Sequence, residues 1–323
     1  MRINPVWFDA IFILRPTLFF PAWTAFLAGC LRFGGIGWGE IILYMIWMGG
    51  ASGASFLANQ WTDRSEDELN DKLLPLWGSR INSRMIQFEL LFLAIGVIVG
   101  AIWAGGEASA LLLLFFLVAG VLYNFAPFRL KGRPILGIFA CAGGVWILFI
   151  LGARQAGADF GAAVLLGMPY AFAAAAASLL THVPDLRGDR ISGVRTFPVV
   201  YGIKATAVGA VLFVASSAGL ALYLRDLVLI SATLLSLPFY MRFFFSLRSE
   251  HAEFAVKMSL FSLALMVGLK WIPFLLLIAG YYFFARWYHR ARLGIEYPSF
   301  GSRSLPVRRV HPLREPAEEL DAI

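Results

Sequence analysis

Two groups of acidic residues have a spacing that could bind a cation. In the first group, Asn59, Asp63 and Asp67 stand four residues apart. A helix that continues through them would present one amide and two carboxylates on one face, about one turn apart. In the second group, Asp185 and Asp189 are again four residues apart. Four carboxylates gathered in one place repel one another and lose hydration, so we expect a cation among them.

Magnesium is the cation that this chemistry indicates. It takes oxygen ligands and usually binds through one or two carboxylates, with water or substrate phosphate completing its shell. Two such sites facing each other would suit a diphosphate bridged by metal ions, which would neutralise it as a leaving group. Cleavage of the carbon–oxygen bond would then release an allylic cation. The alternative reading, solvated loop acids, explains one pair of carboxylates but not two clusters at corresponding helix ends.

A third segment offers basic and aromatic partners for such a substrate. Lys131 and Arg129 could hold diphosphate oxygens through charge-assisted hydrogen bonds. Tyr123 could face a developing carbocation with its ring or its hydroxyl group. The alternative is an interfacial aromatic residue beside ordinary loop cations. Arg15, near one end of the first apolar run, is a further candidate for diphosphate contact, although snorkelling to lipid head groups explains its charge equally well.

The elements that must position these groups are membrane-spanning helices. Hydrophobic residues make up 59% of the 323 positions and charged residues only 15%, which excludes an ordinary water-soluble domain. Runs of about 20 apolar residues, the length that crosses the hydrocarbon core, recur along the chain. The last run is too long for one crossing, and Pro273 lies where it could be split. The runs lie at about 11–32, 38–58, 84–104, 107–123, 134–152, 162–182, 204–224, 227–247 and 255–288.

The distribution of charge among the loops predicts an orientation. Loops after the second, fourth, sixth and eighth runs are rich in Lys and Arg, whereas the others hold little beyond Arg32, Arg154 and Arg225. By the positive-inside rule, the loops that carry the acidic groups are predicted to be cytoplasmic, with a bacterial inner membrane as the expected location. The net charge of +7 is accounted for in this way, so we expect no nucleic acid as a partner.

Together these residues resemble the UbiA-type intramembrane prenyltransferase superfamily, over roughly residues 8 to 288. Residues 59–67 look like its first Asp-rich motif and residues 185–202 like its second. The segment from Tyr123 to Lys131 looks like its tyrosine-to-lysine stretch. The resemblance implies an all-α polytopic bundle of nine or ten transmembrane helices around a central cavity with a cytoplasmic cap. It also implies that Mg²⁺ and an isoprenyl diphosphate bind at the Asp-rich motifs.

The resemblance implies roles for individual residues. Asn59 matches the amide of the first motif and is expected to bind the metal or the diphosphate. Lys131 matches the lysine that contacts diphosphate. Tyr123 is expected to be catalytic together with the aspartates, and Arg129 to bind diphosphate. The metal-associated carboxylates of the family match Asp63, Asp67, Asp185 and Asp189.

Some positions depart from the family pattern. Gln60 stands where Asp is frequent, and the second motif begins with Thr181-His182 in place of Asn-Asp or Lys-Asp. Leu74-Pro75-Leu76 stands where many relatives have Arg-Pro-Ile, so that basic contact is either absent or supplied by Lys72 or Arg80. These changes leave the four aspartates intact, but they affect which acceptor the resemblance implies.

We therefore predict a membrane domain over residues 1–293 and a basic, disordered tail over residues 294–323. The predicted activity is Mg²⁺-dependent transfer of an isoprenyl group from a prenyl diphosphate to a lipophilic acceptor, an aromatic or quinone precursor, among membrane lipids. A second prediction is a membrane terpene cyclase that acts on prenyl diphosphate without a second substrate, which no sequence feature excludes. A transporter is less expected, because its ionisable residues would lie near the midplane rather than at one face.

Overall fold

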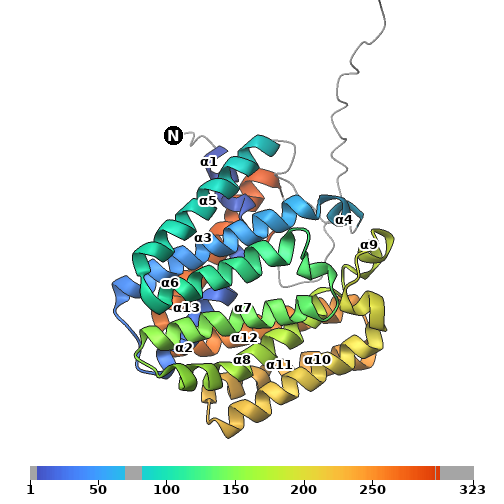
Figure 1. Cartoon of the computed structure of the whole chain (residues 1–323). Helices are drawn as coiled ribbons and strands as arrows, with labels where there is room; N and C mark the ends of the chain where they lie inside the picture. The colour runs from blue at the N-terminus through green and yellow to red at the C-terminus, as the bar shows by residue number, and fades with distance from the viewer. Residues whose placement is uncertain (1–5, 70–81, 295, 299–323) are drawn as a thin grey trace, which may run out of the picture.

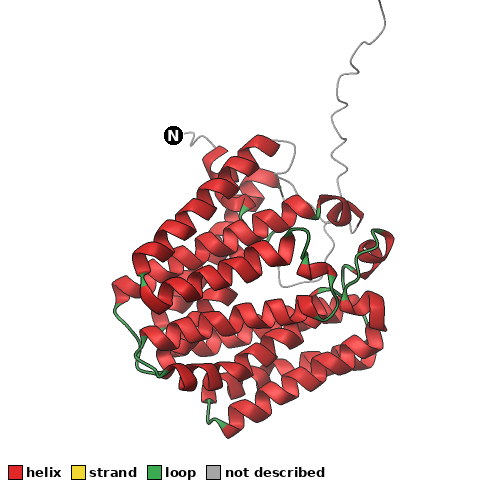
Figure 2. Ribbon diagram, viewed as in Figure 1, coloured by secondary structure: helices red, strands yellow, loops and turns green. Residues whose placement is uncertain are grey.

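The computed structural model describes residues 6–69, 82–294 and 296–298. Within these ranges every regular element is a helix and no strand occurs (Figures 1 and 2), so the predicted all-α class is confirmed. Seven of these helices are long and apolar enough to cross a membrane, and an eighth span results if a bent pair is counted as one. The predicted count of nine or ten crossings is therefore not established.

The first predicted run is not one helix. Its helical parts are α1 (Val6–Ile13) and α2 (Phe20–Arg32), joined by the 3-10 turn η1 (Pro16–Leu18) and bent by 53°. Arg15 adopts a left-handed conformation with a φ of 51°, and Pro16 has no N–H to donate. The helical hydrogen bonds cannot continue through these two residues, so the expectation of a single helix over residues 11–32 is wrong.

The remaining long helices follow the predicted runs closely. The last run is divided at Trp271 into α12 and α13. Pro273 lies in the first turn of α13, where backbone N–H groups make no hydrogen bond within the helix, so the missing N–H of proline costs nothing there. α10 begins earlier than predicted, at Phe197, and is kinked at Gly202, whose φ is 82°. The helices are α3 (Trp38–Thr62), α5 (Ser83–Ala104), α6 (Gly106–Phe115) with the π-helical turn η2 (Phe116–Leu122), α7 (Leu136–Gln155), α8 (Phe160–Thr181), α10 (Phe197–Tyr223), α11 (Leu227–Ser246), α12 (Ser249–Lys270) and α13 (Ile272–Leu293).

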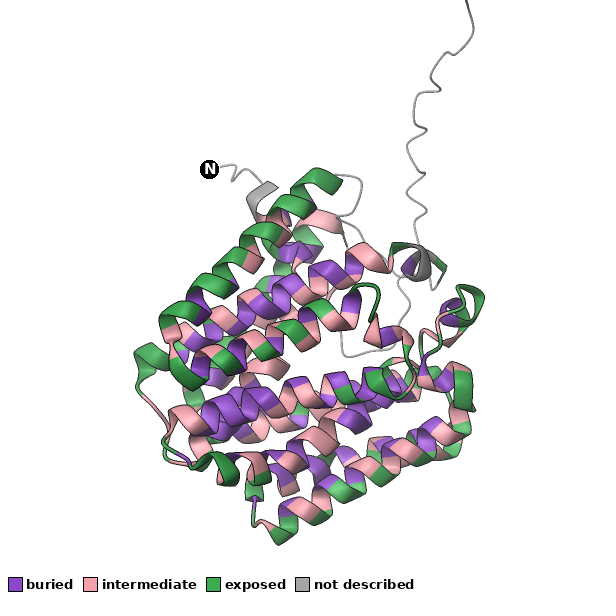
Figure 3. Cartoon of the chain, in the orientation of Figure 1, coloured by how far each residue is buried: buried purple, intermediate pink, exposed green. Residues whose placement is uncertain are grey.

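Burial separates inner helices from those that face the surroundings. In the most apolar window of α7, 61% of the residues are buried, whereas only 22% are buried in that of α5. Figure 3 shows the difference as a mostly buried α7 and a mostly exposed α5. The exposed side chains of α5 include Phe88, Phe92 and Trp103. Large apolar groups on an outer face are expected where lipid replaces water.

Two short helices lie beyond the ends of the long ones. α4 (Arg64–Leu69) follows α3, and α9 (Leu186–Ile191) follows α8. The two short helices contact each other although more than 100 residues separate them in the sequence, and Figure 1 shows them side by side at one end of the bundle. Both acidic segments predicted to carry chemistry therefore lie at the same end.

Candidate functional site

The first acidic segment spans the junction between α3 and α4. The helix does not continue without interruption through Asp67: α3 ends at Thr62, and Asp63 has a φ of −110°. Asn59, Asp63 and Asp67 are nonetheless linked by backbone hydrogen bonds between residues four apart, as in a helix. The Asp63 amide donates to the carbonyl of Asn59 at 2.9 Å, and the Asp67 amide donates to the carbonyl of Asp63 at 2.8 Å.

The Asp63 carboxylate is the centre of a polar cluster. Lys131 Nζ lies 2.6 Å from Asp63 Oδ1, and the Arg129 guanidinium lies 3.2 Å from the same oxygen. Asn59 Nδ2 donates to the other oxygen at 2.8 Å. Lys131 is 7% exposed, and its Nζ also donates to Thr62 Oγ1 at 2.5 Å. The first motif and the basic segment therefore meet in one site.

A tight turn brings both cations to Asp63. Arg129 has a φ of 37°, and the 3-10 turn η3 (Leu130–Gly132) follows it before α7 begins. Gly137 passes close to this turn, since a Cβ there would lie 2.9 Å from the carbonyl oxygen of Leu130. Only a residue without a side chain allows α7 to pack so closely under the turn.

Sequence reasoning assigned no role to Asn124, which the structure places at the centre of this site. Asn124 is buried, and its Nδ2 donates to the carbonyl of Gly120 at 2.9 Å. Its Oδ1 accepts from Asn59 Nδ2 at 3.2 Å. Asn124 thus joins the end of the π-helical turn to α3 and orients the amide that holds Asp63. The available signal was an amide directly after Tyr123 at the end of an apolar run, where an unsatisfied polar group is costly.

The second acidic segment is fixed by hydrogen bonds of its own. Asp185 precedes α9, and the amide of Asp189 donates to its carbonyl at 2.9 Å. Asp189 is buried, and its Oδ2 accepts from Thr196 Oγ1 at 3.0 Å. Because Thr196 is also the residue from which α10 starts, this bond ties the second motif to the following long helix. His182 Nδ1 lies 2.8 Å from the carbonyl oxygen of Ser178.

The two motifs approach each other through their short helices. Asp67 and Asp189 are both buried, on the contacting helices α4 and α9. Tyr123 is half-buried and directly follows η2, next to Asn124. In the described part of the chain, however, no group of three or more acidic, His or Cys side chains is close enough to hold a metal ion by itself.

One predicted diphosphate contact, Arg15, lies outside this cluster, and another, Lys72, falls on a residue that the structure does not describe. Arg15 lies in the turn between α1 and η1, and its side chain makes no hydrogen bond or ion pair within residues 6–69, 82–294 and 296–298. Lys72, like Arg80, lies outside the described residues. The assignments of Arg15 and Lys72 therefore stay predictions.

A cavity of about 60 Å³ lies inside the bundle between α2, α7, α8, α10, α11 and α12. Its walls are largely small side chains, among them Ala173, Ala177 and Ala232, with Tyr240 also in contact. Small-molecule sites usually measure roughly 300–1,000 Å³. A prenyl chain could enter this space only if surrounding side chains or helices moved apart.

The model of the UbiA prenyltransferase family matches residues 18–263, which include both acidic segments and the stretch from Tyr123 to Lys131. The chain belongs to the UbiA prenyltransferase family. As a family member it is an integral membrane prenyltransferase, in agreement with its apolar helices. The resemblance deduced from the sequence is thereby confirmed.

This UbiA family member has relatives with established names. It is 30% identical over 207 residues to the bacteriochlorophyll synthase 33 kDa chain of Cereibacter sphaeroides, over 60% of this chain and 67% of that one. It is 32% identical over 180 residues to digeranylgeranylglyceryl phosphate synthase of Halobacterium salinarum, over 53% of this chain and 63% of that one. The matched regions therefore span about two thirds of these relatives.

Solved structures share the fold. A UbiA homologue from Archaeoglobus fulgidus bound to GPP and Mg²⁺ has a TM-score of 0.64 and 17% identity, covering 82% of this chain and 98% of that one. The apo structure of a UbiA homologue from Aeropyrum pernix K1 also has a TM-score of 0.64, with 16% identity, covering 80% of this chain and 98% of that one. At such identities the likeness shows the fold alone.

Proposed function

We propose that this UbiA family member transfers an isoprenyl group from a prenyl diphosphate to a lipophilic acceptor, and that it depends on Mg²⁺. The observation that carries the proposal is the convergence of Lys131 and Arg129 on Asp63, beside a second acidic segment. Cations held at this place are suited to bind the oxygens of a diphosphate. The Archaeoglobus homologue bound to GPP and Mg²⁺ supports the same substrate class.

The acidic residues fit a magnesium ion that shares its ligands with a substrate. Asp67 and Asp189 are buried carboxylates on contacting helices, with Asp63 and Asp185 at the adjoining helix ends. Since no three carboxylates are gathered together in the described residues, each ion would use one or two of them and phosphate oxygens. When bound, Mg²⁺ would neutralise the diphosphate as a leaving group.

The protein's own residues would bind and orient the substrates. Lys131 and Arg129 would donate hydrogen bonds to diphosphate oxygens as the carbon–oxygen bond breaks and its electron pair leaves with diphosphate. Asn59 would hold Asp63 in place, and the Tyr123 ring would face the allylic carbon. The acceptor supplies the electron pair of the new bond, and its proton passes to the released diphosphate or to a nearby carboxylate.

The acceptor is proposed only as a lipophilic molecule, with an aromatic or quinone precursor as the first candidate. The relatives named above make a bacteriochlorophyll in one case and a glyceryl phosphate lipid in the other, so they do not share one acceptor. Neither name favours the second prediction, a terpene cyclase. The acidic end is proposed to face the cytoplasm of a bacterial cell, and residues 1–293 to form the catalytic domain.

The test is an incubation of detergent-purified protein with Mg²⁺, prenyl diphosphates of several lengths and a panel of lipophilic acceptors, followed by mass spectrometry. We expect an acceptor enlarged by one prenyl group, and none after Mg²⁺ is chelated. Asp63→Asn should lower turnover by about 100-fold or more, as the loss of a charged active-site group usually does. The matched control is Asp159→Asn, which lies at the opposite end of the bundle and caps α8.

Retained turnover in Asp63→Asn would contradict the proposed site. A cyclic terpene made from the donor alone would favour the cyclase instead, because that reaction consumes prenyl diphosphate without any acceptor.

A further inference from the structure

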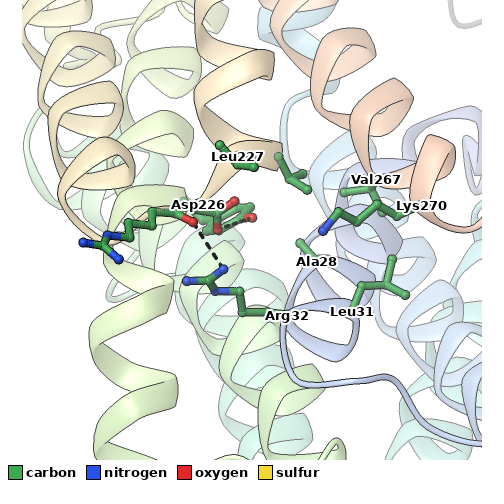
Figure 4. Close-up of a pocket in the computed structure, with 10 residues that line it drawn as sticks. Ala28, Leu31, Arg32, Asp226, Leu227, Val267 and Lys270 are labelled. Carbon is green, nitrogen blue, oxygen red and sulfur yellow. Dashed lines mark hydrogen bonds between the residues drawn. The ribbon is translucent and has the colours of Figure 1, made fainter.

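A second charged cavity lies at the end of the bundle opposite to the acidic segments. It has a volume of about 90 Å³ and lies where α2 and α12 end and α10 turns into α11 (Figure 4). Three cations line it, namely Arg32, Arg225 and Lys270. Figure 4 shows Arg32 and Lys270 reaching toward it from different helices. The volume is sufficient for several water molecules or for one small oxyanion.

The cations at this cavity outnumber its acids. Its one carboxylate, Asp226, is buried and already accepts two hydrogen bonds, from Tyr170 OH at 2.9 Å and from the amide of Leu229 at 3.0 Å. None of the three cations forms an ion pair with any residue that the structure describes. By contrast, Arg154 at the same end is paired with Glu107 at 2.6 Å.

Arg32 has donors to spare. Its guanidinium donates to the carbonyl of Leu224 at 2.9 Å and to that of Arg225 at 3.4 Å. A guanidinium carries five N–H donors in a fixed planar arrangement. The two bonds fix the position of Arg32 against the end of α10 and leave further donors for an acceptor in the cavity.

Arg225 occupies a position that normally belongs to glycine. It has a φ of 55°, its amide donates to the carbonyl of Leu222 at 3.1 Å, and the amide of Asp226 donates to that of Ala221 at 2.8 Å. This is the Schellman pattern of helix ends, in which the left-handed residue is usually Gly. A strained conformation at a charged residue that lines a cavity suggests a role for the side chain.

The surroundings of the cavity are those of a membrane interface. Trp38 and Trp271 pack edge to face at this end, with ring centroids 5.4 Å apart, and tryptophan is enriched at the level of lipid head groups. Leu227, which also lines the cavity, is 72% exposed. Cations beside an exposed aliphatic side chain suit a ligand with an anionic head and an apolar tail.

We propose that this cavity binds the phosphate of an anionic phospholipid from the leaflet opposite to the acidic end. Arg32, Arg225 and Lys270 donate charge-assisted hydrogen bonds to the phosphate oxygens, and the acyl chains lie along Leu227 and its neighbours. The same cations also fit free inorganic phosphate, so the test must separate the two sources.

The test measures the thermal unfolding of the full-length protein in a neutral detergent with added short-chain phosphatidylglycerol. Ligand binding to the folded state should raise Tm by about 3 °C or more at saturating lipid. Phosphatidylcholine should raise it less, because choline brings a further cation to a cationic cavity. Inorganic phosphate at the same concentration identifies the source: an equal shift indicates a free anion, and a smaller shift indicates the lipid.

The informative variant is Arg225→Gly, which relieves the left-handed strain and removes one cation. Its unliganded Tm should equal or exceed that of the wild type, while the lipid-induced shift should fall by about half or more, as it should in Lys270→Gln. Arg154→Gln, a cation at the same end but outside the cavity, should keep the full shift. Native mass spectrometry should show one retained phosphatidylglycerol in the wild type and none in a variant that combines Arg225→Gly with Lys270→Gln. No shift in the wild type, or an unchanged shift in Arg225→Gly, overturns the proposal.

Discussion

At the scale of single residues, the carboxylate of Asp63 connects the two parts of the candidate site. It accepts hydrogen bonds from Asn59, one turn earlier, and from Arg129, and it forms an ion pair with Lys131; both cations lie more than 60 residues later. A carboxylate at a helix end inside a bundle is costly unless it is paired. The pairing also positions two cations where a diphosphate is proposed to bind.

Replacing Lys131 tests that positioning. Lys131→Met keeps the length of the side chain but removes the charge, and we expect kcat/KM to fall by about 30- to 1,000-fold, corresponding to the loss of about 2–4 kcal/mol of transition-state stabilisation. The measurement is steady-state product formation with saturating acceptor. Lys257→Met is the control, since Lys257 pairs with the partly exposed Glu253 one turn away on α12 and such pairs contribute little. Equal activity of the two variants would contradict a diphosphate contact.

At the scale of elements, close packing of α2 against α7 holds the bundle together. Gly29 and Gly152 face each other's helices: a Cβ on Gly29 would lie 2.2 Å from the carbonyl oxygen of Phe149, and a Cβ on Gly152 would lie 2.0 Å from that of Phe26. Helices in membranes associate through such small residues, because lipid provides no hydrophobic driving force between them. The two helices thus touch backbone to backbone.

Gly152→Ala should therefore destabilise the protein, since backbone atoms cannot move aside as a flexible side chain can. We expect a loss of about 2–3 kcal/mol in the free energy of unfolding, in the range of overpacking substitutions, measured by thermal or denaturant unfolding in detergent. The matched control is Gly143→Ala on the same helix, where an added Cβ meets nothing within 4 Å. That change should be neutral or slightly stabilising. Equal stability of the two variants would show that α2 and α7 can separate without cost.

At the scale of the whole molecule, the first and last helices are joined by a buried charge. Asp9 in α1 is fully buried and accepts from Arg292 in α13 at 2.9 Å and 3.2 Å, and from the Tyr288 hydroxyl. Phe12 stacks on Tyr288 in the same contact, with ring centroids 3.7 Å apart. α13 is held to the bundle by these contacts between opposite ends of the chain.

Asp9→Ala should release α13. Breaking a buried pair leaves the remaining charge without its partner, so we expect a loss of about 3 kcal/mol together with faster amide hydrogen exchange in α13. The control is Glu296→Ala, which removes the exposed partner of Arg286 and should change the stability by less than about 0.5 kcal/mol. If α13 stays protected in Asp9→Ala, the charge is not what holds it.

The proposed orientation of the whole bundle can be tested by labelling. Ser192 is exposed at the acidic end, after α9, and Asp159 is exposed at the opposite end, before α8. In intact cells, an impermeant maleimide should label Asp159→Cys but not Ser192→Cys, because the positive-inside rule assigns the acidic end to the cytoplasm. Inverted vesicles should give the reverse result. Labelling of Ser192→Cys but not of Asp159→Cys in intact cells would contradict the orientation.

Local properties of the sequence were sufficient to predict that this is a helical membrane protein and to name most residues of its candidate site. Apolar runs of membrane length predicted the helices because hydropathy is a property of each segment by itself. The four-residue spacing of Asp185 and Asp189 and the basic segment around Lys131 identified candidates for the same reason. The break at Arg15 and Pro16 was also visible in the sequence, as a proline inside an apolar run, although it was not predicted.

Only the tertiary structure decided which of these segments meet. The contact of α4 with α9, the convergence of Lys131 on Asp63 and the burial of Asn124 all join residues far apart in the chain. The cations around the second cavity likewise come from three separate helix ends. Such contacts depend on how whole helices pack, and a given spacing is compatible with many packings. For this chain, the sequence alone determined the membrane class and the family, and the fold determined the partners of each charge.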